Sequence, residues 1–176
     1  MEKCSAAEPE IRLTDVLWVL TVMDERGVGV WLDGGWAVDA CLGAQSRRHR
    51  DLDFAIEEGR VPVAVDALER HGFAALPAEW NFMLGDRTGR LIDFHVVVLD
   101  DDGRRVFGPP RNGERDAADA LSGQGTLGGR RVRCLTPHAL VAFHTGYELD
   151  ADDWADVRAL CERFDIPIPD DYQRFR

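Results

Sequence analysis

The stretch Trp31-Leu-Asp-Gly-Gly-Trp-Ala-Val-Asp39, followed by Asp51-Leu-Asp53 after a short basic segment, decides the fold of this chain. Its pattern predicts a strand, a glycine turn, a helix and a second strand that carries two carboxylates. Gly34 and Gly35 let the backbone bend sharply and leave no side chain to obstruct a bulky ligand. The amide groups at the start of the next helix are natural anion binders. The stretch therefore predicts an anion site at a turn.

The two carboxylates of Asp51 and Asp53 extend this interpretation. They are two positions apart on a predicted strand, so both point to one face, roughly 7 Å apart along it. Two carboxylates on one face repel each other unless a cation lies between them. A phosphate site at the glycine turn, next to a hard metal ion held by the two carboxylates, is typical of a nucleotide–magnesium site.

Composition narrows the class of protein. The chain has 176 residues and is 45% hydrophobic, which is enough for one compact domain over residues 1–176. The net charge of −11 argues against nucleic acid as a partner, because phosphate backbones need a basic surface. The sequence has no run of about 18 apolar residues and no signal-peptide pattern, so we expect no membrane association and a cytoplasmic location. The oligomeric state stays open, with a homodimer as one alternative.

The cysteines give no sign of a metal or disulfide framework. Cys4, Cys41, Cys134 and Cys161 are scattered, and no two of them form a CxxC pair. The spacing therefore indicates neither a zinc site nor a set of disulfides.

Apolar spacing and turn residues predict a chain of alternating helices and strands. Thr14 and Asp152 are candidate N-caps for the first and last helices, and Thr136-Pro137 is a candidate start for the helix between them. Helices are expected over 15–26, 36–42, 62–70, 137–145 and 153–164. Strands are expected over 28–32, 52–56, 73–76, 80–84, 90–99 and 130–135. Residues 108–125 are expected to form a long loop and 166–169 an extended tail.

The strand expected over 90–99 carries two polar residues among apolar ones. Asp93 and His95 share a face in a stretch otherwise suited to full burial. Because a buried carboxylate is costly unless it is paired or metal-bound, Asp93 invites a functional interpretation. The alternative is that Asp93 accepts a hydrogen bond from a neighbouring arginine. For His95, contact with a substrate and a purely structural role are both open.

These motifs resemble a known group of enzymes. Gly34-Gly35, a fifteen-residue spacer, Asp51-Leu-Asp53 and the later Asp93 resemble the minimal nucleotidyltransferases of the DNA polymerase β superfamily. Four segments are most similar to the small lincosamide nucleotidyltransferases: 31–36, 48–53, 92–95 with 101–103, and 143–148. The aminoglycoside 2''-nucleotidyltransferases share the Gly-Gly-Trp and Asp-x-Asp portions and are less similar afterwards. Val96-Val97, where a proline would be expected, and a longer tail depart from the lincosamide pattern.

The resemblance implies a fold and a reaction. The fold is of the α+β class, a mixed sheet flanked by helices, with a core over about 14–107 and a helical C-terminal portion over about 126–176 that completes the acceptor cleft. The reaction is transfer of a nucleoside monophosphate, AMP from ATP or another nucleoside triphosphate, to a hydroxyl of a small antibiotic. Pyrophosphate is released and the drug is inactivated. Mg²⁺ is the implied cofactor, and a lincosamide the implied acceptor.

The resemblance also assigns roles to residues. Asp51 and Asp53 would hold Mg²⁺, and Gly34-Gly35 would admit the phosphates. Asp93 would either complete the metal site or take the hydroxyl proton as general base, and both roles stay open.

Further residues are candidates on weaker grounds. Arg48 and His49 belong to a basic loop that either contacts phosphate or is merely solvated. Trp36 and Asp39 are expected to fix their helix against the sheet. The candidates for the acceptor pocket are His95, Glu79, Trp80, Tyr147 and Glu148.

Three alternatives compete with this function. A non-catalytic antitoxin or binding module of the same fold would not need three intact carboxylates. A glycosyltransferase could use Asp-x-Asp to hold a sugar nucleotide, but it usually needs a larger domain than the 50 residues that precede Asp51. An aminoglycoside acceptor would suit the acidity of the chain, because aminoglycosides are polycations.

Overall fold

A computed structural model describes residues 10–77, 82–102, 105–107 and 117–175 of the chain. The elements, in order, are α1 (Leu13–Glu25), β1 (Val30–Leu32), α2 (Gly34–Leu42), β2 (Asp51–Glu57), η1 (Glu58–Arg60), α3 (Val61–Glu69), β3 (Ala74–Leu76), β4 (Phe82–Gly85), β5 (Leu91–Leu99), β6 (Arg105–Phe107), α4 (Ala117–Ala120), β7 (Gly123–Leu127), β8 (Arg130–Cys134), α5 (Pro137–Phe143), α6 (Ala151–Phe164) and η2 (Asp170–Phe175).

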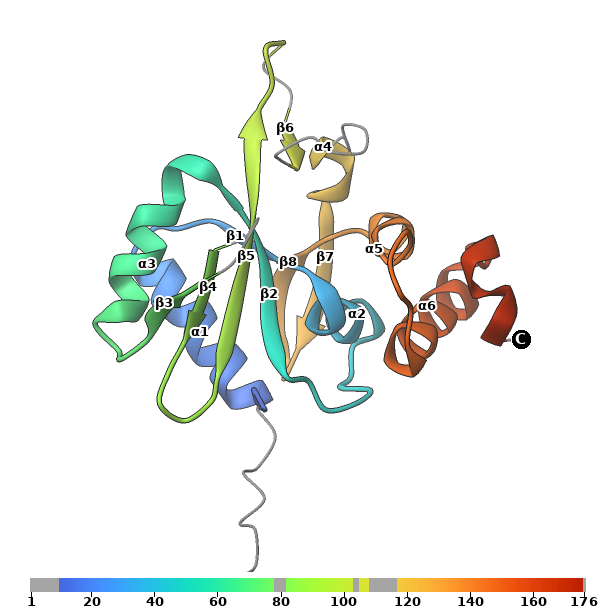
Figure 1. Ribbon diagram of the computed structural model, residues 1–176, viewed down its shortest axis with the longest axis horizontal. Helices are drawn as coiled ribbons and strands as arrows, with labels where there is room; N and C mark the ends of the chain where they lie inside the picture. Colours follow the sequence, from blue (N-terminus) through green and yellow to red (C-terminus); the bar gives the residue numbers. More distant parts are fainter. Residues whose placement is uncertain (1–9, 78–81, 103–104, 108–116, 176) are drawn as a thin grey trace, which may run out of the picture.

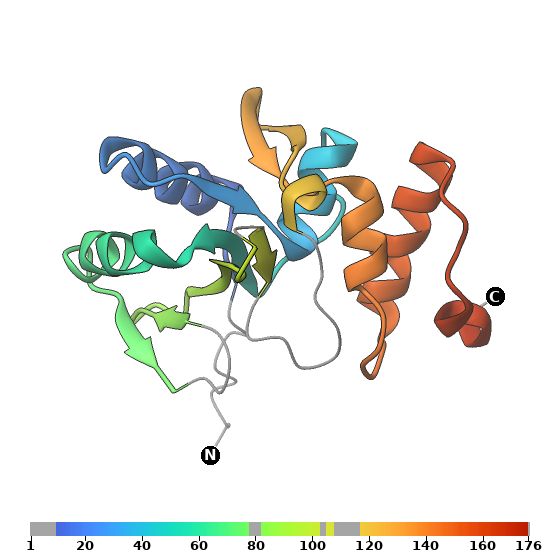
Figure 2. The same cartoon turned by 90° about the horizontal axis from the view of Figure 1, so that it is seen from above.

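The strands form one mixed sheet in the order β3-β4-β5-β2-β1-β8-β7, with β6 paired to β5 (Figure 1). β2 pairs with β5 and β1 pairs with β8 in parallel, whereas the other pairs are antiparallel. Helices α1 and α3 lie on one side of the sheet, and α2, α5 and α6 lie on the other (Figures 1 and 2). The predicted α+β class, a mixed sheet flanked by helices, is confirmed.

The alternation along β2 separates the core from the polar face. Leu52, Phe54 and Ile56 are fully buried in the hydrophobic core. Because side chains alternate along a strand, Asp51 and Asp53 point to the opposite face, as the sequence predicted. That face lies towards α2, whose first residues approach the Asp53 carboxylate.

Helix α2 begins two residues before the predicted start at Trp36. The Asp33 carboxylate accepts a hydrogen bond from the Gly34 N–H at 2.8 Å, so Asp33 acts as the N-cap. Gly43 ends the helix with a φ of 79°, a left-handed conformation that favours glycine. Trp36 and Asp39, expected to fix the helix against the sheet, are buried at 1% and 0% exposed, and both contact His49 of the basic loop.

Two predicted N-caps were wrong. Thr14 lies inside α1, and the start of this helix is fixed instead by the Asp15 carboxylate, which accepts from the Arg12 N–H at 3.0 Å. Asp152 lies inside α6, where Asp150 is the N-cap and accepts from the N–H groups of residues 152 and 153. In each case several acidic or hydroxyl residues stand close together, and only backbone geometry selects one of them.

The stretch expected to be a loop over 108–125 also contains regular structure. Within its described part lie α4 and the start of β7, and β6 ends just before it. β7 pairs along its whole length with β8, and a side chain at Gly125 would overlap the backbone of Ala40 in α2. The glycines that suggested a loop instead permit close packing of strand on helix.

Residues 166–169, expected to form an extended tail, contain no regular secondary structure, and η2 follows them. Tyr172 is fully buried there, and its hydroxyl donates to the His144 carbonyl at 2.6 Å. In the part of the chain that the structure describes, no helix has the length and apolar character needed to cross a membrane.

Candidate active site

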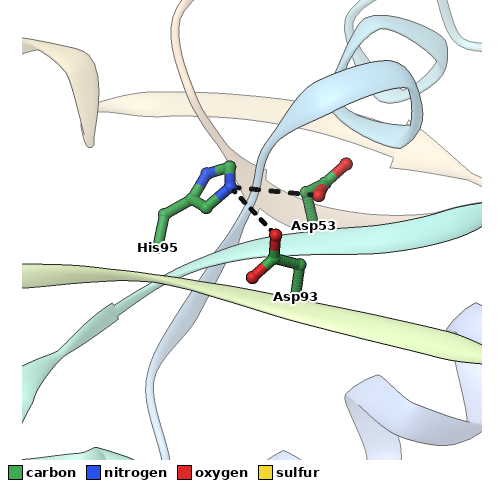
Figure 3. Close-up of side chains that lie close together, drawn as sticks. All are labelled: Asp53, Asp93 and His95. Atoms are coloured by element: carbon green, nitrogen blue, oxygen red, sulfur yellow. Dashed lines mark ion pairs between the residues drawn. The ribbon is translucent and has the colours of Figure 1, made fainter. Parts of the chain in front are cut away.

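The parallel register of β2 and β5 brings the predicted site residues together. Asp53 lies beside Asp93, and Ala55 lies beside His95. The three side chains of Asp53, Asp93 and His95 converge in Figure 3, with ligand atoms within 4.8 Å of one another. His95 Nε2 lies 3.7 Å from Asp93 Oδ2 and 4.0 Å from Asp53 Oδ1. We refer to these three residues as the β2–β5 cluster.

The carboxylate of Asp33, in addition to those of Asp53 and Asp93, orients His95. His95 Nδ1 lies 2.8 Å from Asp33 Oδ2, so the opposite nitrogen faces Asp53 and Asp93. Burial opposes the charge on His95, but hydrogen bonds to Asp33 and Asp93 and the nearby carboxylates raise its pKa well above 6.5. Burial likewise opposes ionisation of Asp33, yet the hydrogen bonds from His95 and Gly34 lower its pKa. Asp33 and His95 thus form an ion pair beside the cluster.

The carboxylates of the site are electrostatically crowded. Burial, followed by the charge of Asp51, raises the pKa of Asp53 to about 8. Burial and the charge of Asp93 also raise the pKa of Asp51. A bound cation would relieve this repulsion and favour the ionised form of each carboxylate. Asp51 interacts electrostatically with Asp53 and Asp93 but is not a member of the β2–β5 cluster.

The two glycines of the turn are required by the protein's own side chains. Gly34 has a φ of +55°, and a Cβ there would overlap the Asp53 carboxylate. A Cβ at Gly35 would lie 2.5 Å from His49 Nδ1 and 2.7 Å from Arg47 Nη2. The turn therefore brings the N-terminus of α2 directly against an acidic residue on one side and a basic loop on the other.

The basic loop places its side chains differently from the prediction. His49 is 3% exposed, and its Nε2 lies 2.5 Å from Asp39 Oδ2 beneath the α2 helix. Arg48 points to Glu10, with Nε 3.0 Å from Glu10 Oε1. His49 therefore lies against the turn but pairs with Asp39, whereas Arg48 pairs with Glu10.

Arg47 was missed by sequence reasoning. Its Nη2 and Nε donate to the Asp156 carboxylate of α6 at 2.7 and 3.1 Å, and Nη1 lies 3.5 Å from Asp152. Nothing in the sequence distinguishes Arg47 from its neighbours, because its partner Asp156 lies 109 positions away. Asp33 was missed as well, although an aspartate directly before a glycine turn and a helix is a recognisable N-cap signal.

Of the remaining acceptor-side candidates, the structure describes Tyr147 and Glu148. Glu79 and Trp80 lie outside the described residues. Tyr147 and Glu148 are exposed on the segment between α5 and α6, and the Tyr147 hydroxyl donates to Asp153 at 2.9 Å. The C-terminal η2 holds this segment in place through a hydrogen bond from the Gly146 N–H to Asp171 at 3.2 Å.

Comparison with known proteins identifies the family. Residues 15–160 match the family model described as aminoglycoside-2''-adenylyltransferase. The chain belongs to this family. A lincosamide resistance protein from Staphylococcus haemolyticus is 28% identical over 149 residues, which cover 83% of this chain and 92% of the relative. A 2''-aminoglycoside nucleotidyltransferase from Escherichia coli is 28% identical over 141 residues, covering 77% of this chain and 75% of the relative.

Solved structures agree with this membership of the aminoglycoside-2''-adenylyltransferase family. A lincosamide antibiotic adenylyltransferase with lincomycin bound superimposes with a TM-score of 0.75 and 26% identity, covering 90% of this chain and 99% of that structure. ANT(2")-Ia in complex with adenylyl-2"-tobramycin superimposes with a TM-score of 0.67 at 22% identity, covering 86% and 88% of the two chains, and supports the fold. The predicted nucleotidyltransferase resemblance and enzyme class are confirmed, and the family implies a nucleoside triphosphate and a divalent metal ion.

Proposed function

We propose that the protein transfers AMP from Mg²⁺-ATP to a hydroxyl of a lincosamide antibiotic, with release of pyrophosphate and inactivation of the drug. One observation carries this proposal. Asp53 of β2 and Asp93 of β5 are paired side by side, and the turn at Gly34 lies against Asp53. The turn supplies the start of a helix for phosphate, and the strands supply carboxylates for a cation, within one continuous site.

The carboxylates fit a hard divalent cation. Asp51, Asp53 and Asp93 offer oxygen donors. Burial and then the charge of Asp51 raise the pKa of Asp53 to about 8, and a bound cation would favour its ionised form. We assign Asp51 and Asp53 to Mg²⁺. When bound there, the metal ion would neutralise charge on the triphosphate and its leaving group.

Phosphate binding is assigned to the glycine turn and Arg47. The guanidinium of Arg47 lies over Gly35. Its Nε contacts both carboxylate oxygens of Asp156, its Nη2 contacts one of them, and its Nη1 donates to the Arg48 carbonyl. A guanidinium has five N–H donors, so Arg47 retains donors that suit a phosphate. In this assignment Arg47 takes the role that the sequence suggested for Arg48 and His49, and His49 supports the turn from below through Asp39.

We assign Asp93 as the group that accepts the hydroxyl proton. The hydrogen bond with Asp33 favours the protonated form of the neighbouring His95, which leaves Asp93 as the better proton acceptor of the two. Asp93 is 9% exposed and points to the same face as Asp53. If Asp93 is the base, Asp93→Asn should leave nucleotide binding near normal and reduce turnover about 10²-fold or more.

The pH profile separates this role from metal binding. Raised pH should partly rescue Asp93→Asn when the missing function is proton removal, because more of the hydroxyl then ionises unaided. Joint weakening of nucleotide affinity and Mg²⁺ dependence, without rescue, would assign Asp93 to the metal instead. Wild-type turnover in Asp93→Asn would exclude both roles.

An aminoglycoside acceptor is the second candidate. It is favoured by the description of the matching family and by the net charge of −11, which suits a polycation. The lincosamide is preferred because the lincosamide resistance protein matches over 92% of its length, and the lincomycin-bound structure is matched over 99% of its length.

A screen of purified protein tests the proposal. ATP, GTP, CTP and UTP are each combined with Mg²⁺ and with lincomycin or tobramycin, and pyrophosphate release is measured. We expect release with ATP and lincomycin, and none with Asp53→Asn as the matched control. Release only with tobramycin would favour the second candidate. Nucleotide binding without any acceptor-dependent release would support a binding module of the same fold.

A further inference from the structure

Two cysteines that are 93 positions apart meet behind the glycine turn. Cys41 is in the last turn of α2, and Cys134 is the last residue of β8. Their sulfur atoms lie 3.8 Å apart. Cys41 is partly exposed, whereas Cys134 is fully buried. Nothing in the sequence indicates this pair, because only the crossing of α2 over the sheet brings the two residues together.

The packing around the pair is tight on several sides. Cys134 is in register with Leu32 of β1, and the following Leu135 N–H donates to the Leu32 carbonyl at 2.9 Å. A Cβ at Gly123 would lie 2.5 Å from the Cys134 carbonyl oxygen, so β7 closes against this part of β8. The backbones that carry the two thiols are therefore held close by their neighbours in the sheet and in α2.

We propose that Cys41 and Cys134 form an oxidant-responsive thiol pair that closes to a reversible intramolecular disulfide. A disulfide has an S–S distance of about 2.0 Å, so the sulfurs must approach by a little under 2 Å. Side-chain rotation of the partly exposed Cys41, with a small shift of the end of α2, supplies that movement. The crosslink fastens the far end of the helix whose first turn borders Asp53.

The chemistry requires a two-electron oxidant, and hydrogen peroxide is the simplest. The Cys41 thiolate attacks one peroxide oxygen, the O–O bond breaks, and Cys41 becomes a sulfenic acid as hydroxide leaves. The Cys134 sulfur then attacks the Cys41 sulfur and displaces its hydroxyl, which departs as water with the Cys134 proton. In total, two thiols and one hydrogen peroxide give one disulfide and two waters.

The environment of each thiol suits its role. A hydrogen bond from Cys134 lowers the pKa of Cys41, so the more accessible sulfur is the one that ionises more readily. The hydrogen bond with Cys41, together with burial, raises the pKa of Cys134, which fits a thiol that donates a proton and acts second.

The test uses full-length protein freed of reductant and treated with hydrogen peroxide. Remaining thiols are then blocked with N-ethylmaleimide under denaturing conditions and counted by mass spectrometry. We expect the free thiols to fall from the four of the sequence to two, and dithiothreitol to restore all four. A digest should contain one peptide that links Cys41 to Cys134. The thermal unfolding midpoint should rise on oxidation, because the crosslink closes a long loop in the unfolded chain.

Single variants provide the controls. Cys161→Ser removes another buried cysteine, which lies away from the pair near the Pro167 carbonyl, and should leave the crosslink and the rise in midpoint unchanged. Cys41→Ser changes a partly exposed side chain and should abolish both. An unchanged thiol count would overturn the proposal. A linked peptide that contains Cys4 or Cys161, a crosslinked dimer, or a Cys41 that stops at the sulfinic acid would overturn it as well.

Discussion

Asp53 is buried beside other carboxylates, and both conditions disfavour its ionised form. Its pKa is raised from 3.8 to about 8 by burial and then by the charge of Asp51. Between these two pH values the native state holds a proton that the unfolded state has lost. Because the native state then binds more protons, the free energy of unfolding falls as pH rises through this window.

This repulsion predicts a stabilising substitution. Asp51→Asn removes a charge that acts on Asp53, so it should stabilise the metal-free protein at pH 8 by on the order of 1 kcal/mol, or about 2–4 °C in midpoint. The measurement is thermal unfolding in EDTA at pH 5 and pH 8, where the gain should appear mainly at the higher pH. A loss of stability at pH 8 would show that Asp51 is not a source of repulsion.

Gly34 predicts a substitution that damages the turn. Gly34→Ala places a side chain in a left-handed conformation and against the Asp53 carboxylate, so it should cost more than the roughly 1–2 kcal/mol of backbone strain alone. Gly43 is the matched control, because its φ of +79° is also left-handed and a Cβ there meets open space. Urea denaturation should show a larger loss for Gly34→Ala than for Gly43→Ala. Equal losses would mean that contact with Asp53 does not constrain the turn.

Between elements, the link from the basic loop to α6 carries a prediction. Asp156 is 2% exposed and holds Arg47 through three hydrogen-bond contacts, whereas Asp152 is 53% exposed and lies 3.5 Å from the same guanidinium. Breaking the buried contact with Asp156→Asn should cost about 2–3 kcal/mol, below the range for fully buried pairs because Arg47 is partly solvated. The exposed contact should contribute at most about 0.5 kcal/mol, so Asp152→Asn is the control.

The two variants are compared by chemical denaturation at matched ionic strength. A similar small effect from both would show that the Arg47–Asp156 pair does not fasten α6 to the loop. Turnover of the folded Asp156→Asn protein, measured without denaturant, reports whether the position of Arg47 matters to the reaction.

Strong alternation made some elements predictable from sequence. β2 and β5 were expected from their apolar faces, and their polar residues Asp53, Asp93 and His95 lie together as the shared face requires. β6 was missed because a strand of three residues gives little alternation, and β7 was missed because its glycines resemble a loop until a partner strand is known. Gly125 illustrates this, since only the closeness of the Ala40 backbone explains a glycine in β7.

Over the whole molecule, long-range contacts set the limit of prediction. Family, fold and enzyme class followed from the resemblance to known nucleotidyltransferases that the glycine turn, Asp51-Leu-Asp53 and Asp93 carry. The partners of Arg47, Arg48 and His49 did not follow, because each is chosen by a residue that the fold brings from elsewhere. The division into a single domain and the homodimer alternative stay predictions, although one hydrophobic cluster includes residues from Ile11 to Tyr172.

Mass spectrometry of the antibiotic after incubation with the protein, ATP and Mg²⁺ tests the proposed reaction most directly. We predict lincomycin that has gained one adenylyl group, formed together with pyrophosphate by the wild-type protein and not by Asp53→Asn. Unmodified lincomycin and tobramycin, with ATP consumed to ADP and phosphate or not at all, would contradict nucleotidyl transfer at this site.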